Sequence, residues 1–149
     1  MRINKYLTIV VLALGCDQVV TISDDHDANM RLSFECGNIL LRAKTMGARH
    51  FWIYLNCELR SEVSIKKSEI NVLFKRDTIP FKISDGDNEV NGLVTVNGSK
   101  ELRIYFELRS PDIPLMGDTI KLDLGRSLKC SDRSIDLRPI YFVMRREFR

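Results

Sequence analysis

Residues 102–109 read LRIYFELR, and this stretch decides the fold class. Apolar side chains stand at every second position, and Arg103, Tyr105 and Glu107 lie between them. Successive side chains of a β-strand point to opposite faces of a sheet. The stretch therefore predicts a strand with one face in a core and the other toward solvent.

The same period of two recurs on both sides of this stretch. It appears in residues 32–36, 51–59, 63–65, 70–74, 79–83, 120–124 and 140–144. Asn97-Gly98 predicts a two-residue hairpin, because both residues tolerate positive φ. Pro111 and Pro114 bracket a loop that no central strand could cross. Residues 39–48 are ambiguous, and a short helix stays open there.

About eight to ten short strands with regular turns are typical of an all-β sandwich or barrel. We expect an antiparallel immunoglobulin-like β-sandwich that forms a single domain over residues 31–149. The chain of 149 residues suits one such domain. Trp52 follows Cys36, but no Tyr stands two residues before Cys130. Only the general immunoglobulin-like architecture is therefore predicted, without the sequence signature of true immunoglobulin domains.

The composition argues against one class of partner. Hydrophobic residues make up 44% of the chain and charged residues 29%, which is typical of a folded protein. The formal net charge is +3, but Arg2 and Lys5 lie in a segment that we expect to be removed. Without them, the chain has 21 basic and 20 acidic side chains. A nearly neutral domain gives no electrostatic reason to expect a nucleic acid as partner.

The first 15 residues have the layout of a secretory signal. Arg2 and Lys5 precede an apolar run over residues 6–14, and Gly15 and Cys16 follow it. The run is far shorter than the roughly 20 residues that a membrane-spanning helix needs. We therefore expect residues 1–15 to be a cleaved signal peptide and not a permanent transmembrane helix.

The cleavage site supports a more specific interpretation. The sequence Ala13-Leu14-Gly15-Cys16 resembles the lipobox of bacterial lipoproteins. The resemblance implies that Cys16 receives a diacylglycerol on its sulfur and becomes the new N-terminus after cleavage. Ala13 stands where Leu is the commonest residue of that class. Two other interpretations stay open: ordinary cleavage that releases a soluble protein, and a buried first strand or helix.

Residues 16–30 are expected to form the lipidated cysteine and a flexible tether. The run Ser23-Asp24-Asp25-His26-Asp27 is polar and has no period, which favours a solvated linker. Asp and His side chains can bind a divalent ion, but a metal site needs ligands that converge from a rigid frame. We therefore predict no metal site there.

Three cysteines remain beyond Cys16, namely Cys36, Cys57 and Cys130. An exported domain lies where disulfides persist, and three cysteines allow three single pairings. All three share the parity of apolar neighbours, so buried free thiols stay an alternative. If one bridge forms, we expect Cys57–Cys130, because both residues lie in well-patterned strands far apart in sequence.

The chain contains no recognisable catalytic, metal-binding or phosphate-binding motif, so we predict no catalytic residues and no cofactor. His50 precedes a strand, where a surface role is expected. Residues 85–88, Asp-Gly-Asp-Asn, are expected to form a plain turn, with weak calcium binding as the alternative. Trp52, Tyr54 and Tyr105 have outward parity, and exposed aromatic side chains can form a binding face.

The expected function is that of an envelope lipoprotein, lipid-anchored to an inner or outer membrane, with a non-catalytic β-sandwich. The domain would bind an envelope protein partner or play a structural role. Two alternatives stay open. One is a secreted soluble β-domain that acts as an inhibitor or ligand carrier, and the other is an enzyme whose site is built from scattered loop residues.

Overall fold

The computed structural model describes residues 18–22, 28–46, 49–109 and 117–144. Across these residues the protein is all-β, with one short 3-10 helix, η1 (Lys67–Glu69). In the same ranges, no helix has the length and apolar character that crossing a bilayer requires. The strands are β1 (Gln18–Ile22), β2 (Ala28–Phe34), β3 (Gly37–Met46), β4 (His50–Leu59), β5 (Val63–Lys66), β6 (Asn71–Phe74), β7 (Asp77–Thr78), β8 (Phe81–Asp85), β9 (Asn88–Val90), β10 (Leu93–Val96), β11 (Ser99–Glu107), β12 (Thr119–Asp123), β13 (Leu128–Cys130), β14 (Arg133–Ile135) and β15 (Ile140–Met144).

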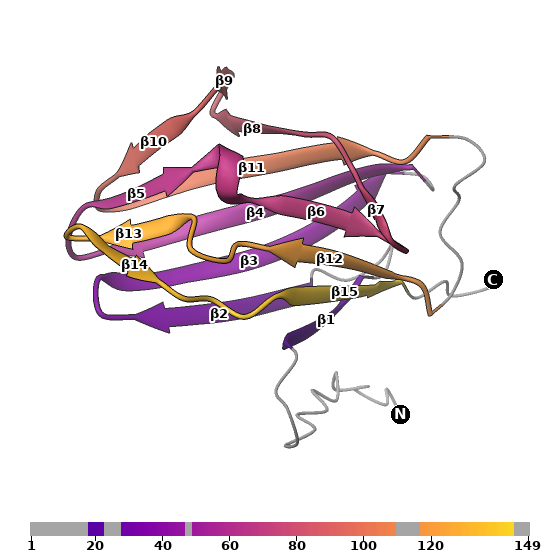
Figure 1. The fold of residues 1–149 in the computed structure, drawn as a ribbon, viewed down its shortest axis with the longest axis horizontal. Helices are drawn as coiled ribbons and strands as arrows, with labels where there is room; N and C mark the ends of the chain where they lie inside the picture. Colours follow the sequence, from indigo (N-terminus) through magenta and orange to yellow (C-terminus); the bar gives the residue numbers. More distant parts are fainter. Residues whose placement is uncertain (1–17, 23–27, 47–48, 110–116, 145–149) are drawn as a thin grey trace, which may run out of the picture.

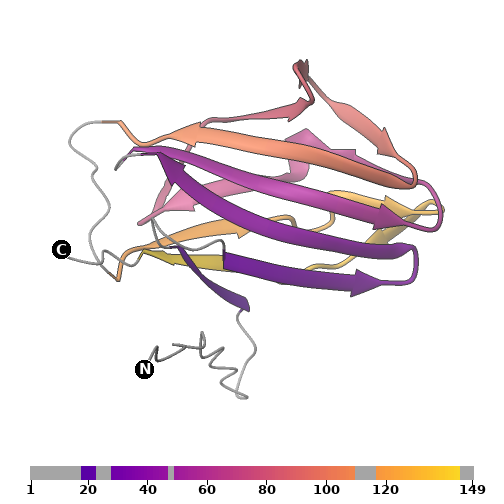
Figure 2. The ribbon, with the colours of Figure 1, turned by 180° about the vertical axis from the view of Figure 1, so that it is seen from behind.

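The strands form three hydrogen-bonded sheets that lie in two facing layers (Figure 1). One layer is a six-stranded sheet with the order β2-β3-β4-β11-β8-β9, which lies nearer the viewer in Figure 2. The other layer holds the four-stranded sheet β10-β5-β13-β14 and the five-stranded sheet β1-β15-β12-β6-β7. Among the described strands, every pairing except the parallel β1–β15 pair is antiparallel. The predicted all-β fold with antiparallel sheets is confirmed.

The hydrophobic core lies between the two layers. The six-stranded sheet contributes Phe51 and Phe106, whose rings stack with centroids 5.2 Å apart. Phe74 and Phe142 come from the five-stranded sheet, and all four rings are buried. Each large apolar side chain contributes about 1.5–3 kcal/mol when it is fully buried. The alternation visible in the sequence therefore supplies the inner faces that hold the layers together.

Strand β3 covers residues 39–46 of the ambiguous stretch, and residues 47 and 48 lie outside the described residues. Its residues pair with β2 on one side and with β4 on the other. Ile39, Leu41 and Ala43 all point into the core. Pairing along both edges outweighs the local helix propensity of this stretch, because it satisfies the backbone polar groups on both sides.

The turn at Asn97-Gly98 corrects one prediction. Gly98 has a φ of +72°, as expected, but β10 and β11 do not pair with each other. Strand β10 pairs with β5, whereas β11 pairs with β4 and β8 in the opposite layer. The predicted hairpin is therefore a corner that carries the chain between layers. The turn chemistry requires positive φ but does not specify which strands become neighbours.

The N-terminal strand differs from the expected flexible tether over residues 16–30. Strand β1 pairs in parallel with β15, and β2 already begins at Ala28. The sequence of β1, Gln-Val-Val-Thr-Ile, is rich in β-branched residues that favour a strand. The acidic run at 23–27, the signal segment 1–15 and Cys16 lie outside the described residues. So do Pro111, Pro114 and His26.

The disulfide joins Cys36 to Cys130, and the predicted Cys57–Cys130 pairing is wrong. Cys36 lies in the two-residue turn between β2 and β3, and Cys130 ends β13 in the facing layer. Their Cα atoms are 6.1 Å apart, within the range that a bridge needs. The bridge closes a loop with a sequence separation of 94 residues, so it removes much entropy from the unfolded chain. Regular strand patterning therefore does not identify the partners, because a turn can approach the other layer more closely.

Cys57 is a buried free thiol in β4. Burial raises the pKa of this thiol to about 11, and Lys100 offsets part of the effect. The Cys57 Sγ donates to the backbone oxygen of Leu55 at 3.7 Å. This cysteine therefore behaves as a small hydrophobic side chain of the core.

Gly37 permits the tight β2–β3 turn that positions Cys36. Its φ is +139°, and its Cα lies directly against β4. A Cβ at this position would overlap the backbone oxygen of Glu58 and would lie 2.8 Å from the Leu59 Cα. Only glycine therefore fits without moving the neighbouring strand.

We expect Gly37→Ala to lower the free energy of unfolding by about 2–5 kcal/mol, because an unfavourable φ and a backbone overlap both oppose the side chain. Gly92→Ala is the matched control, since Gly92 has a φ of +130° but has open space around its Cα. For Gly92→Ala, the free energy of unfolding should fall by only about 1–2 kcal/mol. Denaturant unfolding measures both values, and equal losses would contradict the packing argument.

We expect the thiols to differ in alkylation by iodoacetamide. In a full-length chain carrying Cys16→Ser, a peptide map without reductant should show Cys36 linked to Cys130. Cys57 should stay unmodified at pH 8 until denaturant is added, since a pKa near 11 leaves about one thiol in a thousand ionised. Rapid labelling of Cys57 in the native protein, or a Cys57 crosslink, would contradict the structure.

Candidate functional site

The outer face of the six-stranded sheet carries a group of aromatic side chains near its centre. Trp52 and Tyr54 come from β4, and Tyr105 comes from β11. All three are half-buried, because the buried residues of these strands alternate with them. The predicted outward parity of these aromatic residues is therefore confirmed, and the pairing of β4 with β11 brings them together.

His50, Trp52 and Tyr105 form one ring cluster. The Trp52 and Tyr105 centroids are 5.0 Å apart, and Tyr105 stacks against His50 with centroids at 6.2 Å. The His50 Nδ1 and the Tyr105 hydroxyl are hydrogen-bonded at 2.9 Å. These contacts orient the three rings relative to one another, so they present a defined surface.

Tyr54 lies between two guanidinium groups. The Arg42 Cζ is 5.3 Å from the ring centroid, and the Arg103 Cζ is 5.9 Å from it. The strand register explains this arrangement, because Tyr54 is directly opposite Arg42 on β3 and Arg103 on β11. Cation–π attraction therefore holds both arginines beside the ring.

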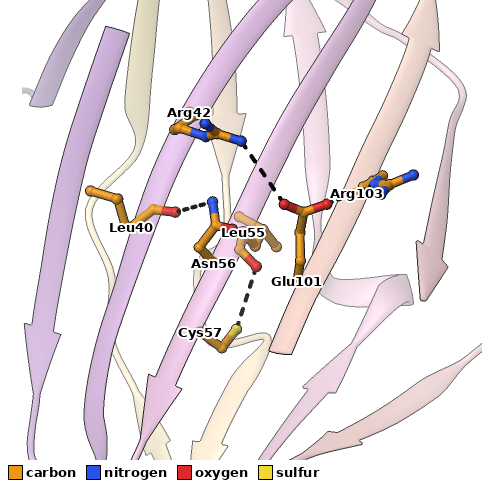
Figure 3. A network of polar contacts seen from close by, with 7 residues as sticks. All are labelled: Leu40, Arg42, Leu55, Asn56, Cys57, Glu101 and Arg103. Atoms are coloured by element: carbon orange, nitrogen blue, oxygen red, sulfur yellow. Dashed lines mark hydrogen bonds and ion pairs between the residues drawn. The ribbon is translucent and has the colours of Figure 1, made fainter. Parts of the chain in front are cut away.

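Glu101 connects the two arginines (Figure 3). Its Oε1 accepts a hydrogen bond from the Arg103 Nε at 2.8 Å, and its Oε2 lies 4.0 Å from the Arg42 Nη2. The hydrogen bond to Glu101 raises the pKa of Arg103 above its usual range, so Arg103 stays charged. Nearby, Asn56 Nδ2 donates to the Leu40 carbonyl at 3.5 Å.

The two central rows of this face combine aromatic rings with cations. In the first row, Lys44 on β3 is opposite Trp52, and Lys82 on β8 is opposite Tyr105. The second row contains Arg42, Tyr54 and Arg103. The first row thus has two rings between two cations, and the second has one ring between two cations.

A groove of about 360 Å³ continues the ring cluster toward β8 and β9. Its lining includes Phe81, Lys82, Glu89, Tyr105, Glu107 and Arg109. Lys82 Nζ lies 3.6 Å from a Glu89 carboxylate oxygen, and Tyr105 belongs to both the groove and the cluster. The groove therefore offers donors, acceptors and apolar surface next to the rings.

The other candidate residues lie elsewhere. The turn at residues 85–88 joins β8 to β9, and the Asp85 carboxylate is ion-paired with Lys100. Within the ranges that the structure describes, no three His, Cys, Asp or Glu side chains gather as metal ligands. Cys16, the proposed lipid site, lies outside those ranges.

The sequence alone does not identify the two arginines beside Tyr54. Arg42 and Arg103 are 61 positions apart in the chain, and only the strand register places them at the same ring. Their outward parity next to an aromatic position was a visible signal, but parity alone does not identify cross-strand neighbours.

Comparison of the chain with protein-family models, curated proteins and solved structures finds no match.

Proposed function

We propose that the protein is an envelope lipoprotein, anchored through lipid on Cys16, whose β-domain is a non-catalytic binding module. The binding role rests on one observation. The outer face of the six-stranded sheet holds an oriented ring cluster with cations beside it and a groove at its end. Surfaces that bind partners are enriched in Trp, Tyr and Arg, which occupy the centre of this face.

The disulfide supports an exported location. Bridges persist in secreted and envelope proteins and are rare where glutathione keeps thiols reduced. Cys36–Cys130 joins the two layers of the domain, and such a bridge would persist in the oxidising conditions outside the cytoplasm. Export is also what the signal-like residues 1–15 imply.

We further propose that the domain is an immunoglobulin-like sandwich. Two layers of antiparallel strands face each other, and a disulfide connects them, as in immunoglobulin domains. The parallel β1–β15 pair and the placement of Cys36 in a turn are features of this chain.

His50 favours recognition over catalysis. Its Nδ1 is engaged with the Tyr105 hydroxyl, and its ring stacks on the same residue. This arrangement orients the rings of a surface.

The anchored form can be distinguished from a released inhibitor or ligand carrier by cell fractionation. The anchored lipoprotein would be found with the membranes, whereas a released protein would be found in the soluble fraction.

Metabolic labelling with palmitate tests the anchor. We expect the wild-type chain to incorporate label and to pellet with membranes, and Cys16→Ser to do neither, because only the Cys16 thiol receives lipid. Cys57→Ala is the matched control, since Cys57 is buried, and it should be labelled like the wild type. Equal labelling of Cys16→Ser and wild type, or none in either, would refute the lipoprotein assignment.

A further inference from the structure

We propose that the outer face of the six-stranded sheet binds an acidic saccharide chain. The ring cluster of His50, Trp52 and Tyr105 would contact a sugar ring, and Arg42 and Arg103 would contact its carboxylates. This inference rests on the proposed binding function and specifies the ligand class of that surface.

The ring cluster offers aromatic surface on which one face of a pyranose could pack. A sugar ring presents a flat patch of C–H groups, and such patches pack on aromatic side chains that are fixed in position. Trp52 and Tyr105 are adjacent and half-buried, so their edges and faces are already ordered before any ligand arrives. An ordered surface loses little side-chain entropy on binding.

The lining of the groove suits a ligand that is rich in hydroxyl groups. Glu89 and Glu107 line it together with Lys82 and Arg109. Sugar hydroxyl groups both donate and accept hydrogen bonds, so they suit a lining of carboxylates and cations. The mixed charge of the groove therefore favours a hydroxyl-rich ligand.

The arginines explain why the saccharide should be acidic. Arg42 and Arg103 lie on both sides of Tyr54, and Tyr54 is two residues from Trp52 on the same strand. Two residues of a strand span about 7 Å, so the cations lie near the next ring of a chain that rests on Trp52. Guanidinium groups bind carboxylates through paired hydrogen bonds. Lys44 and Lys82 add positive charge at the ends of the neighbouring row.

Calorimetric titration of the purified full-length protein in mild detergent tests the proposal. The probes are short fragments of polygalacturonate and the same fragments as methyl esters, in which each carboxylate is replaced by an uncharged ester group. We expect the acid to bind at least about tenfold more tightly than the ester at low salt, because the ester lacks the carboxylates. The difference should shrink as salt screens the cations.

Two variants separate the roles of rings and cations. Trp52→Ala should weaken binding of both probes at least about tenfold. Arg103→Gln should weaken binding of the acid by about tenfold and leave the ester nearly unchanged. Tyr141→Ala and Arg133→Gln are matched controls, because both residues lie in the other layer, and they should bind like the wild type.

Thermal unfolding confirms that each variant is folded, and Tyr105→Ala replaces Trp52→Ala if the latter is not. The proposal would be overturned if neither probe binds. It would also be overturned if Trp52→Ala or Tyr105→Ala binds the probes as tightly as the wild type. Tighter binding of single-stranded DNA than of the acid would overturn it as well. Because the titration does not depend on the anchor, palmitate labelling without saccharide binding would refute this inference alone.

Discussion

The antiparallel register of β4 with β11 is the constraint on which both faces of the six-stranded sheet depend. It places Phe51 against Phe106 on the inner face and Trp52 against Tyr105 on the outer face. A shift of one residue would exchange the two faces, because side chains alternate along each strand. Burial of the inner set therefore fixes the position of the outer set, although the outer residues contribute less to stability.

The layers are connected by a corner and by a covalent bond. The chain crosses from β10 to β11 at Asn97-Gly98, and the disulfide joins the β2–β3 turn to β13. The corner and the Cys36 end of the disulfide use residues outside regular strands, whereas Cys130 is the last residue of β13. Gly37 makes the second one feasible, because its missing side chain lets the turn approach β4. A tight backbone contact in one layer thus supports the bond to the other layer.

The polar contacts of the outer face position side chains more than they stabilise the domain. Glu101, Arg42 and Arg103 are partly or largely exposed, and exposed ion pairs add little to the free energy of folding. They do restrict how the guanidinium groups lie beside Tyr54. A surface that is ordered without being needed for the fold is suited to recognition, which links this geometry to the proposed function.

Alternation along the chain was enough to assign the fold class and the inward or outward parity of most strand residues, because it is a local property. Tyr54 and Tyr105 were therefore correctly placed on the outer face. Only the tertiary structure decided the disulfide partner, the corner at Gly98 and the arginines beside Tyr54. These features depend on which strands become neighbours and in which register. That choice is made by packing between segments far apart in the chain, which no local pattern records.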